Sequence, residues 1–134
     1  MSTDRTFVKV EDASCWFDVS PPWLERVVKR RPRVQLKAVN GVSFSLVKGE
    51  TLALVGESGC GKSTVARMLV GLYEPTSGNI EFDGQPISML RSREGQKLRQ
   101  RLQMIFQDPY ASLNPRWRVA RIIAETLQVH GKLN

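Results

Sequence analysis

Residues 56–63, Gly-Glu-Ser-Gly-Cys-Gly-Lys-Ser, are the stretch of this sequence that most decides its fold. They match in full the pattern G-x-x-x-x-G-K-[ST], whose backbone N–H groups surround the phosphates of a nucleotide. Gly59 and Gly61 can take backbone angles that side chains forbid, so that successive N–H groups turn inward as an anion-binding nest. The stretch therefore predicts a phosphate-binding loop, or P-loop.

Two side chains of the predicted P-loop have specific chemical tasks. Lys62 would reach the β- and γ-phosphates as a point charge, and the hydroxyl of Ser63 would bind Mg²⁺. The positive end of the helix that begins here would add to the attraction for phosphate. The residues expected to bind a Mg-nucleotide are Gly56, Glu57, Ser58, Gly59, Cys60, Gly61, Lys62, Ser63 and Thr64.

The residues on either side of the loop have the pattern that a P-loop requires, which is a buried strand before it and a helix after it. Thr51–Val55 is a short and almost wholly apolar run, which predicts a central parallel strand buried on both faces. Apolar residues then recur at helical spacing, at Val65, Met68, Leu69 and Leu72. The sequence around the loop therefore predicts an α/β fold.

The composition is that of a globular protein of ordinary domain size. The chain has 134 residues, of which 41% are hydrophobic and 25% are charged. No stretch approaches the roughly 20 apolar residues of a membrane span, and residues 1–5 lack the layout of a secretory signal. Cys15 and Cys60 make no disulfide framework, so we expect a reducing, cytosolic setting.

The net charge of +7 is unevenly spread along the chain. One basic cluster comprises Arg26, Lys29, Arg30, Arg31, Arg33 and Lys37, and a second comprises Arg91, Arg93, Lys97, Arg99 and Arg101. Each is typical of a solvated face, and each would also attract an anionic membrane surface or nucleic acid. No aromatic–basic RNA motif or recognition-helix pattern accompanies them, so nucleic acid is the weaker expectation.

Short strands and turns account for much of the remaining chain. The expected strands are Phe7–Val10, Val42–Leu46, Asn79–Phe82 and Leu102–Phe106. Residues 18–37 hold the first basic cluster and three prolines, which predicts a basic inserted loop with a short helix over residues 22–30. An amphipathic helix is expected from the apolar residues Val119, Ile122, Ile123 and Leu127.

Four stretches narrow the class of nucleotide-binding protein. Residues 57–64 (ESGCGKST) resemble the Walker A motif of ATP-binding cassette (ABC) transporters, and residues 71–78 (GLYEPTSG) resemble the stretch after the P-loop helix in the same proteins. Residues 104–115 (MIFQDPYASLNP) are similar to the Q-loop of the oligopeptide, dipeptide and nickel importer branch, and residues 36–44 are also similar to that branch. The resemblance covers roughly residues 7–127, with the motifs in the same order and spacing.

The resemblance implies roles for residues outside the P-loop pattern. Gln107 would be the Q-loop glutamine, whose amide oxygen coordinates Mg²⁺ or its water, so Lys62 and Gln107 are the candidate catalytic residues. An aromatic side chain near the N-terminus would stack on adenine, with Phe17 the best-placed candidate and Trp16 the alternative. The expected cofactors are then ATP and Mg²⁺, with the metal at Ser63 and Gln107.

The resemblance also implies an architecture, an ABC-type P-loop NTPase with an N-terminal antiparallel β subdomain and a parallel-sheet core. The sequence has no Leu-Ser-Gly-Gly-Gln signature and no Walker B aspartate–glutamate pair, and its one histidine, His130, is expected on the surface. We therefore expect residues 1–134 to be the N-terminal part of one ATP-binding domain, truncated before those motifs, with residues 115–130 starting the helical subdomain. Such a chain would bind nucleotide at most, and an apolar strand left at a sheet edge would favour aggregation.

The function that the resemblance implies is coupling of ATP binding and hydrolysis to import of di- or oligopeptides. The implied partners are transmembrane permease subunits, contacted through the Q-loop region, a second ATP-binding subunit and, indirectly, a substrate-binding protein. The implied location is peripheral, on the cytoplasmic face of the cell membrane. Two alternatives stay open at this point: a soluble ABC-type ATPase that acts on nucleic acid or ribosomes, and a P-loop small-molecule kinase.

Overall fold

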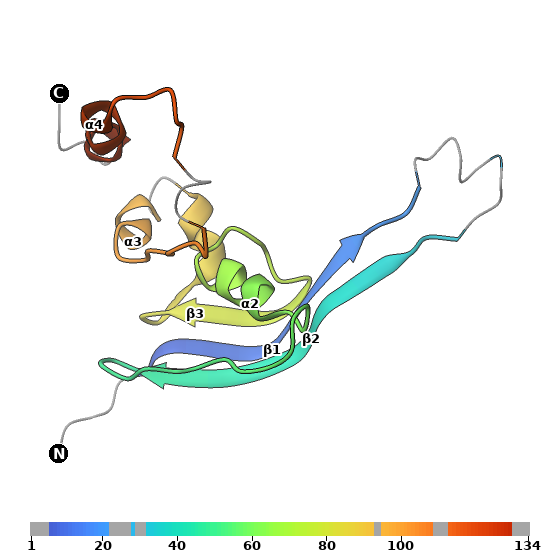
Figure 1. The fold of residues 1–134 in the computed structure, drawn as a ribbon. Helices are drawn as coiled ribbons and strands as arrows, with labels where there is room; N and C mark the ends of the chain where they lie inside the picture. The colour runs from blue at the N-terminus through green and yellow to red at the C-terminus, as the bar shows by residue number, and fades with distance from the viewer. Residues whose placement is uncertain (1–5, 22–27, 29–31, 93–94, 109–112, 130–134) are drawn as a thin grey trace, which may run out of the picture.

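The computed structural model describes residues 6–21, 28, 32–92, 95–108 and 113–129. Its described part contains a four-stranded antiparallel sheet in the order β2-β1-β3-β4. The strands are β1 (Thr6–Asp18), β2 (Gln35–Val47), β3 (Ser77–Phe82) and β4 (Gln85–Pro86). The far ends of β1 and β2 extend away from the rest of the molecule as a long two-stranded arm (Figure 1).

Helices cover one face of this sheet, as Figure 1 shows. They are α2 (Lys62–Leu69), the 3₁₀ helix η1 (Ile87–Arg91) and α3 (Gln96–Arg99), and α4 (Val119–Val129) follows further along the chain. Val65 and Met68 of α2 are buried against the sheet together with Leu90 of η1. The buried hydrophobic core consists of Val10, Ala13, Cys15, Val39, Val65, Met68, Ile80, Phe82, Ile87, Leu90 and Leu98. The P-loop helix thus packs on the sheet through this shared core.

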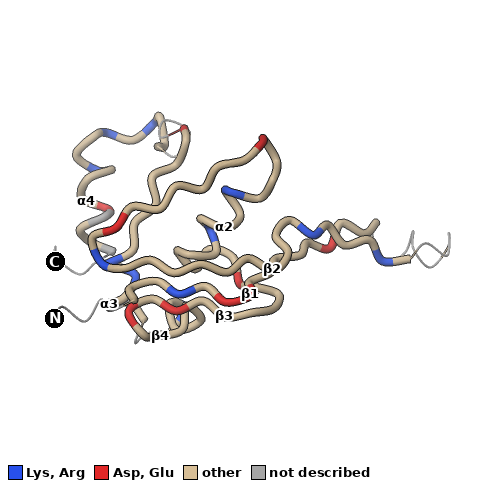
Figure 2. Tube along the Cα trace, turned by 90° about the horizontal axis from the view of Figure 1, so that it is seen from below, with Lys and Arg blue, Asp and Glu red and all other residues tan. Residues whose placement is uncertain are grey.

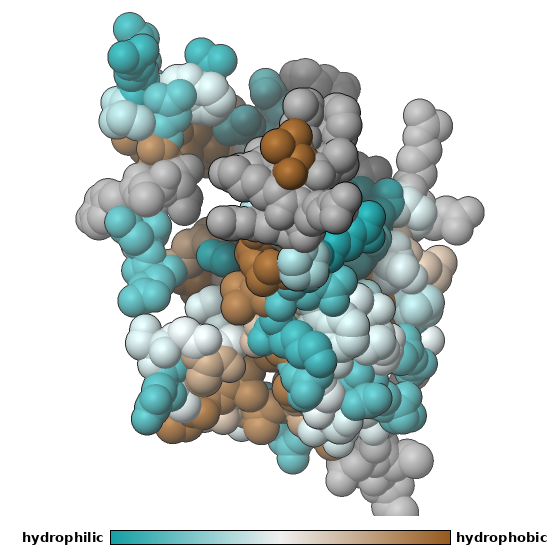
Figure 3. Space-filling view, turned by 90° about the vertical axis from the view of Figure 1, so that its right-hand side faces the viewer, coloured by the Kyte–Doolittle hydropathy of each residue, from teal (hydrophilic) through white to brown (hydrophobic). Residues whose placement is uncertain are grey.

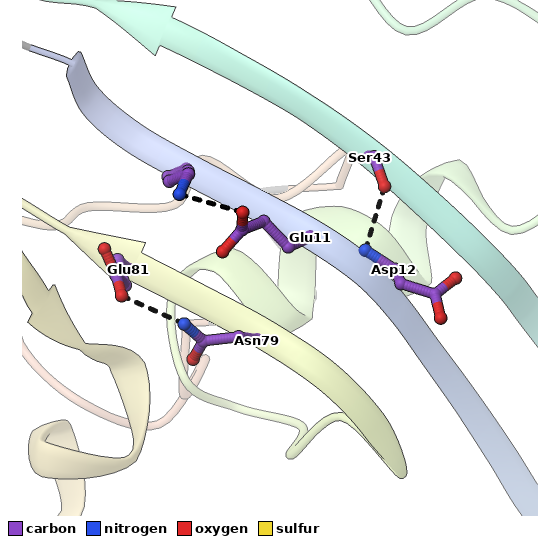
Figure 4. A network of polar contacts seen from close by, with 6 residues as sticks. Glu11, Asp12, Ser43, Asn79 and Glu81 are labelled. Atoms are coloured by element: carbon purple, nitrogen blue, oxygen red, sulfur yellow. Dashed lines mark hydrogen bonds and ion pairs between the residues drawn. The ribbon is translucent and has the colours of Figure 1, made fainter.

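Strand β1 is irregular at its centre, where the register with β2 shifts around residues 10–15. Asp12 has a positive φ of 48°, and its backbone N–H donates to Oγ of Ser43 over 2.8 Å (Figure 4). Ser14, which is buried, accepts a hydrogen bond from the N–H of Gly41 over 2.9 Å. These side-chain contacts replace ladder bonds that the bulge interrupts. Because the bulge changes which face each residue meets, it sets the orientation of Trp16 and Phe17 further along β1.

Charged residues of both signs lie along β1, and β3 carries the acidic residue Glu81 (Figure 2). Lys9 forms an ion pair with Glu11 over 2.8 Å, and Nδ2 of Asn79 donates to Oε1 of Glu81 over 3.0 Å (Figure 4). Lys9, Glu11 and Asn79 are exposed and Glu81 is half-buried, and exposed pairs of this kind contribute little net stability. The stability of the sheet therefore comes from its other face, which packs against the helices.

Several expected elements are confirmed. The strands expected at residues 7–10, 42–46 and 79–82 lie within β1, β2 and β3, although β1 and β2 each extend to 13 residues. The amphipathic helix expected around residues 119–127 is α4. Most of the helix expected over residues 22–30 lies outside the described residues. Within the part that the structure describes, no helix is long and apolar enough to cross a membrane.

Two expected strands are wrong, since neither Thr51–Val55 nor Leu102–Phe106 is a strand in the structure. A strand requires hydrogen-bonded neighbours, and the sheet described here contains neither segment. Val55 is 92% exposed and Ile105 is 93% exposed, which is unusual for large apolar side chains. The apolar composition of these two segments therefore predicted hydrophobic contacts correctly. It did not predict whether the segments pair as strands in the described sheet.

The apolar segments at residues 51–55 and 102–106 lie close to each other in the structure. Leu52 and Leu54 from the first and Met104 and Ile105 from the second line one open hollow, together with Ala66 and Leu69 of α2. Figure 3 shows hydrophobic residues exposed on the face turned to the viewer, among them a group low in the view. The segments that precede the P-loop and Gln107 thus meet beside the P-loop helix.

Candidate functional site

The P-loop lies between the apolar segment at residues 51–55 and helix α2. Gly59 and Gly61 have φ angles of +83° and +97°, so both hold the conformation that the sequence pattern predicts for the loop. Gly61 also caps α2, and a Cβ placed on it would collide with the carbonyl oxygen of Ala38 in β2. Only glycine satisfies both demands at position 61, the positive φ and the close approach of the neighbouring strand.

The ammonium group of Lys62 lies over its own loop. Its Nζ donates to the carbonyl oxygens of Gly56 over 2.7 Å and Glu57 over 2.6 Å, and it lies 3.5 Å from Sγ of Cys60. These are the contacts of a cation held close to the N-terminus of α2, where partial positive charge also accumulates. Since an ammonium has three donors, an anion bound in the loop could replace one or more of these carbonyl contacts.

Beside the loop is a hollow of about 590 Å³, within the roughly 300–1,000 Å³ of typical ligand pockets. Its lining comes from three separate parts of the chain. The residues are Phe17 of β1, Leu36 and Ala38 of β2, Ser58, Gly59, Gly61, Lys62, Ser63 and Thr64 of the P-loop, and Gln107. One end of the hollow is therefore polar and rich in N–H donors, and the other end is apolar.

Two neighbouring aromatic residues of β1 are placed differently with respect to this hollow. Phe17 lines it and packs edge to face against Tyr73, with ring centroids 5.2 Å apart. Trp16 is not among its lining residues, and Nζ of Lys37 lies 4.8 Å from the centroid of the Trp16 ring. Adjacent residues of a strand point to opposite faces, so only one of the two can face the hollow. Of the two expected aromatic residues, Phe17 is therefore the one that lines the hollow.

Gln107 ends the apolar segment at residues 102–106 and is exposed. It lines the hollow at the P-loop and also the apolar hollow described above, in both cases with Lys62 and Ser63. The structure therefore brings Gln107 beside the P-loop, although Gln107 lies 43 positions after Thr64 in the sequence. This proximity is the arrangement that the resemblance implied.

Three of the expected binding residues, Gly56, Glu57 and Cys60, belong to the loop but do not line the hollow. Gly56 and Glu57 contribute carbonyl oxygens to Lys62 instead, and Cys60 is exposed. Conversely, Leu36 and Ala38 line the hollow and were not expected from the sequence. Leu36 pairs with Phe17 across the β1–β2 ladder, and that register is the signal that would have identified it.

Comparison with known protein families decides the class of this chain. Residues 39–131 match the family model described as ABC transporter, which includes the P-loop, Gln107 and α4. The chain belongs to the ABC transporter family. In this ABC-family chain, P-loop residues and Gln107 line one and the same hollow.

Relatives with curated names are similar over almost the whole ABC-family chain. It is 56% identical over 133 residues to a putative peptide import ATP-binding protein of Brucella abortus, covering 96% of this chain and 37% of that one. It is 46% identical over 130 residues to the oligopeptide transport ATP-binding protein AppF of Bacillus subtilis, covering 96% and 38%. The chain thus spans less than two fifths of the length of these relatives.

A solved structure shows the same fold. The ATP-binding subunit of an ABC transporter superposes with a TM-score of 0.63 over 96% of this chain and 44% of that one, at 22% sequence identity. At that identity the likeness concerns the fold alone. Together with the family match, the four-stranded antiparallel sheet with α2 packed against it confirms the expected ABC-type fold class.

Proposed function

We propose that this chain forms part of an ATP-binding subunit that couples ATP binding and hydrolysis to import of peptides. The single observation that carries the proposal is the hollow that unites Phe17, the P-loop and Gln107. The names of the relatives in Brucella abortus and Bacillus subtilis, which refer to peptide import and oligopeptide transport, support the peptide substrate. This chain covers less than two fifths of those proteins, so we propose the transport activity for the subunit of which the chain forms part.

The residues of the hollow fit a nucleotide triphosphate with a divalent cation. At the polar end, N–H groups of residues 59–64 and the ammonium of Lys62 would neutralise phosphate charge. The Ser63 hydroxyl is exposed and borders the hollow, as does the Gln107 amide, so both would hold Mg²⁺, which prefers oxygen ligands and retains phosphates and waters. Bound there, Mg²⁺ would supply charge stabilisation at the transferring phosphoryl group.

The apolar end of the hollow fits a purine base. Phe17 offers an aromatic ring, and Leu36 and Ala38 offer aliphatic surface beside it. Stacking on an aromatic ring is favourable for any base, so this end would orient the nucleotide without setting strong specificity. At the other end of the hollow, Lys62 and Gln107 would contact the phosphates and their cation.

The partners proposed for the subunit are those of an importer. Transmembrane permease subunits would contact the segment that follows Gln107, and a second ATP-binding subunit would complete the hydrolytic site. A substrate-binding protein would act indirectly, through the permease. The proposed position is peripheral, on the cytoplasmic face of the cell membrane.

The proposal is tested by uptake of a labelled oligopeptide in cells that depend on this protein for peptide import. Cells with the Lys62→Ala variant should lose uptake, because the phosphate-binding cation is removed. Cells with Lys97→Ala, which removes an exposed lysine of α3 outside the hollow, should keep it. Undiminished uptake in the Lys62→Ala cells, at equal protein level, would contradict the proposed function.

A further inference from the structure

Tyr73 lies between the P-loop helix and Phe17, and its side chain contacts both. The Tyr73 and Phe17 rings meet edge to face, with centroids 5.2 Å apart and planes at 75°. On the helix side, Nη1 of Arg67 donates to the Tyr73 hydroxyl over 3.3 Å, and the guanidinium carbon lies 5.7 Å from the centre of the Tyr73 ring. Both aromatic rings are half-buried, so neither is free to turn as an exposed side chain would be.

The backbone ties Tyr73 to the same helix. The N–H groups of Leu72 and Tyr73 both donate to the carbonyl oxygen of Arg67, over 2.9 Å and 3.3 Å. Arg67 lies about one helical turn after Ser63 in α2. Tyr73 is therefore held, through backbone and side chain together, by the helix whose first turn carries the phosphate-binding residues.

We infer that Tyr73 is a positioning residue for the base-binding end of the site, because it fixes the orientation of the Phe17 ring. This inference rests on the proposed function. The Tyr73 ring, nearly perpendicular to that of Phe17, restrains the plane of the Phe17 ring. Because Tyr73 covers at most one face of that ring, the other face stays available to a base. The contacts from Arg67 to Tyr73 to Phe17 then connect the phosphate end of the hollow with its base end.

A purely structural role for Tyr73 would have a different signature. Both Tyr73 and Phe17 pack against the hydrophobic core, so loss of Tyr73 could simply loosen the fold and weaken every ligand equally. A positioning role affects only ligands that carry a base. Inorganic tripolyphosphate has no base and would occupy only the phosphate end, so comparison of its affinity with that of Mg-ATP separates the two roles.

The experiment measures the affinities of Mg-ATP and of Mg-tripolyphosphate for the full chain and its variants by calorimetry. Tyr73→Leu should weaken Mg-ATP binding roughly two- to tenfold, which is the strength of an edge-to-face aromatic pair, and leave tripolyphosphate unchanged. Tyr73→Phe, which keeps the ring, should bind Mg-ATP almost as tightly as the original chain. In a Phe17→Ala background, Tyr73→Leu should have no further effect.

A matched control and a second variant distinguish a specific loss of Mg-ATP affinity from a general loss of folded protein. Phe7→Leu removes a ring that also packs edge to face, against Phe82 at 4.7 Å, but that does not line the hollow, and it should leave both affinities unchanged. Arg67→Met removes the hydrogen bond to Tyr73 and should produce a smaller loss for Mg-ATP alone.

The positioning role is overturned if Tyr73→Leu weakens both ligands equally, changes neither, or retains its full effect without Phe17. In that case Mg-ATP still binds to the original chain and is still lost on Lys62→Ala, so the proposed function stands. If the original chain binds neither ligand, the proposed function and the role of Tyr73 both fail.

Discussion

The close approach of Gly61 to strand β2 gives the most specific prediction for the fold of the P-loop. In a Gly61→Ala variant, the new Cβ would collide with the carbonyl oxygen of Ala38 and lie 3.3 Å from Cγ2 of Val39. The φ of +97° adds strain for a residue with a side chain, about 1–2 kcal/mol. Displacement of β2 adds about 1–3 kcal/mol, as overpacking does elsewhere. We therefore expect about 3 kcal/mol of lost stability.

Gly59→Ala is the matched control. Gly59 has a similar φ of +83°, but no atom lies within 4 Å of the position that its Cβ would take. Only the conformational cost of about 1–2 kcal/mol then applies. Urea denaturation of the full chain measures both, and the difference should shift the midpoint by about 1 M, given slopes of about 1–3 kcal/mol per M. Equal destabilisation in the two variants would refute the claim that contact with Ala38 is what requires glycine at position 61.

Four further predictions concern separate parts of the molecule. Ser63→Ala should weaken nucleotide binding in the presence of Mg²⁺ but not in excess EDTA, as measured by titration with ATP; an unaltered Mg²⁺ dependence would argue against its role as a metal ligand. A maleimide should label exposed Cys60 quickly, and ATP should slow this labelling because the loop closes around phosphate; labelling that ATP leaves unchanged would count against it. Burial raises the pKa of the Cys15 thiol above its ordinary 9.0, so the folded state holds this proton more tightly, and stability should fall as pH rises above about 9.0, less so in Cys15→Ala; identical pH profiles would be evidence to the contrary. Arg101→Met should cost about 1 kcal/mol in urea denaturation, because Arg101 pairs with Asp83 over 2.8 Å and its guanidinium lies 5.3 Å from the Phe82 ring centre; the half-exposed pair should lose part of this in 1 M salt.

The P-loop could be predicted from the sequence because its constraints are local. The glycine spacing fixes where positive φ angles must occur, and Gly59 and Gly61 have them. The apolar spacing of Val65 and Met68 similarly identified the face of α2 that packs on the sheet. Each of these features depends on residues within a few positions of one another, so no knowledge of the sheet was needed.

Other features depend on strand register, which the sequence does not reveal. The bulge near Asp12 breaks the alternation in β1, so the expected first strand ended at Val10 although the strand continues to Asp18. The same uncertainty left Phe17 and Trp16 as alternatives, since one position decides which of them faces the hollow. Leu36 was missed because its role follows only from its pairing with Phe17.

The apolar run at residues 51–55 shows a further limit of sequence patterns. Hydrophobic composition records that a segment favours apolar surroundings, but it does not specify the strands that would pair with it. Leu52 and Leu54 do line an apolar hollow with Met104 and Ile105, so the hydrophobic signal was real. The strand assignment failed because it required hydrogen-bonding neighbours that the described sheet does not contain.

Direct measurement of nucleotide binding tests the central claim, that the hollow at the P-loop holds a Mg-nucleotide. Titration of the full chain with Mg-ATP in a calorimeter should show one saturable site. The site should be lost in Lys62→Ala and retained in Lys97→Ala. Absence of binding to the original chain, or equal affinity in the Lys62→Ala variant, would contradict the assignment of this hollow.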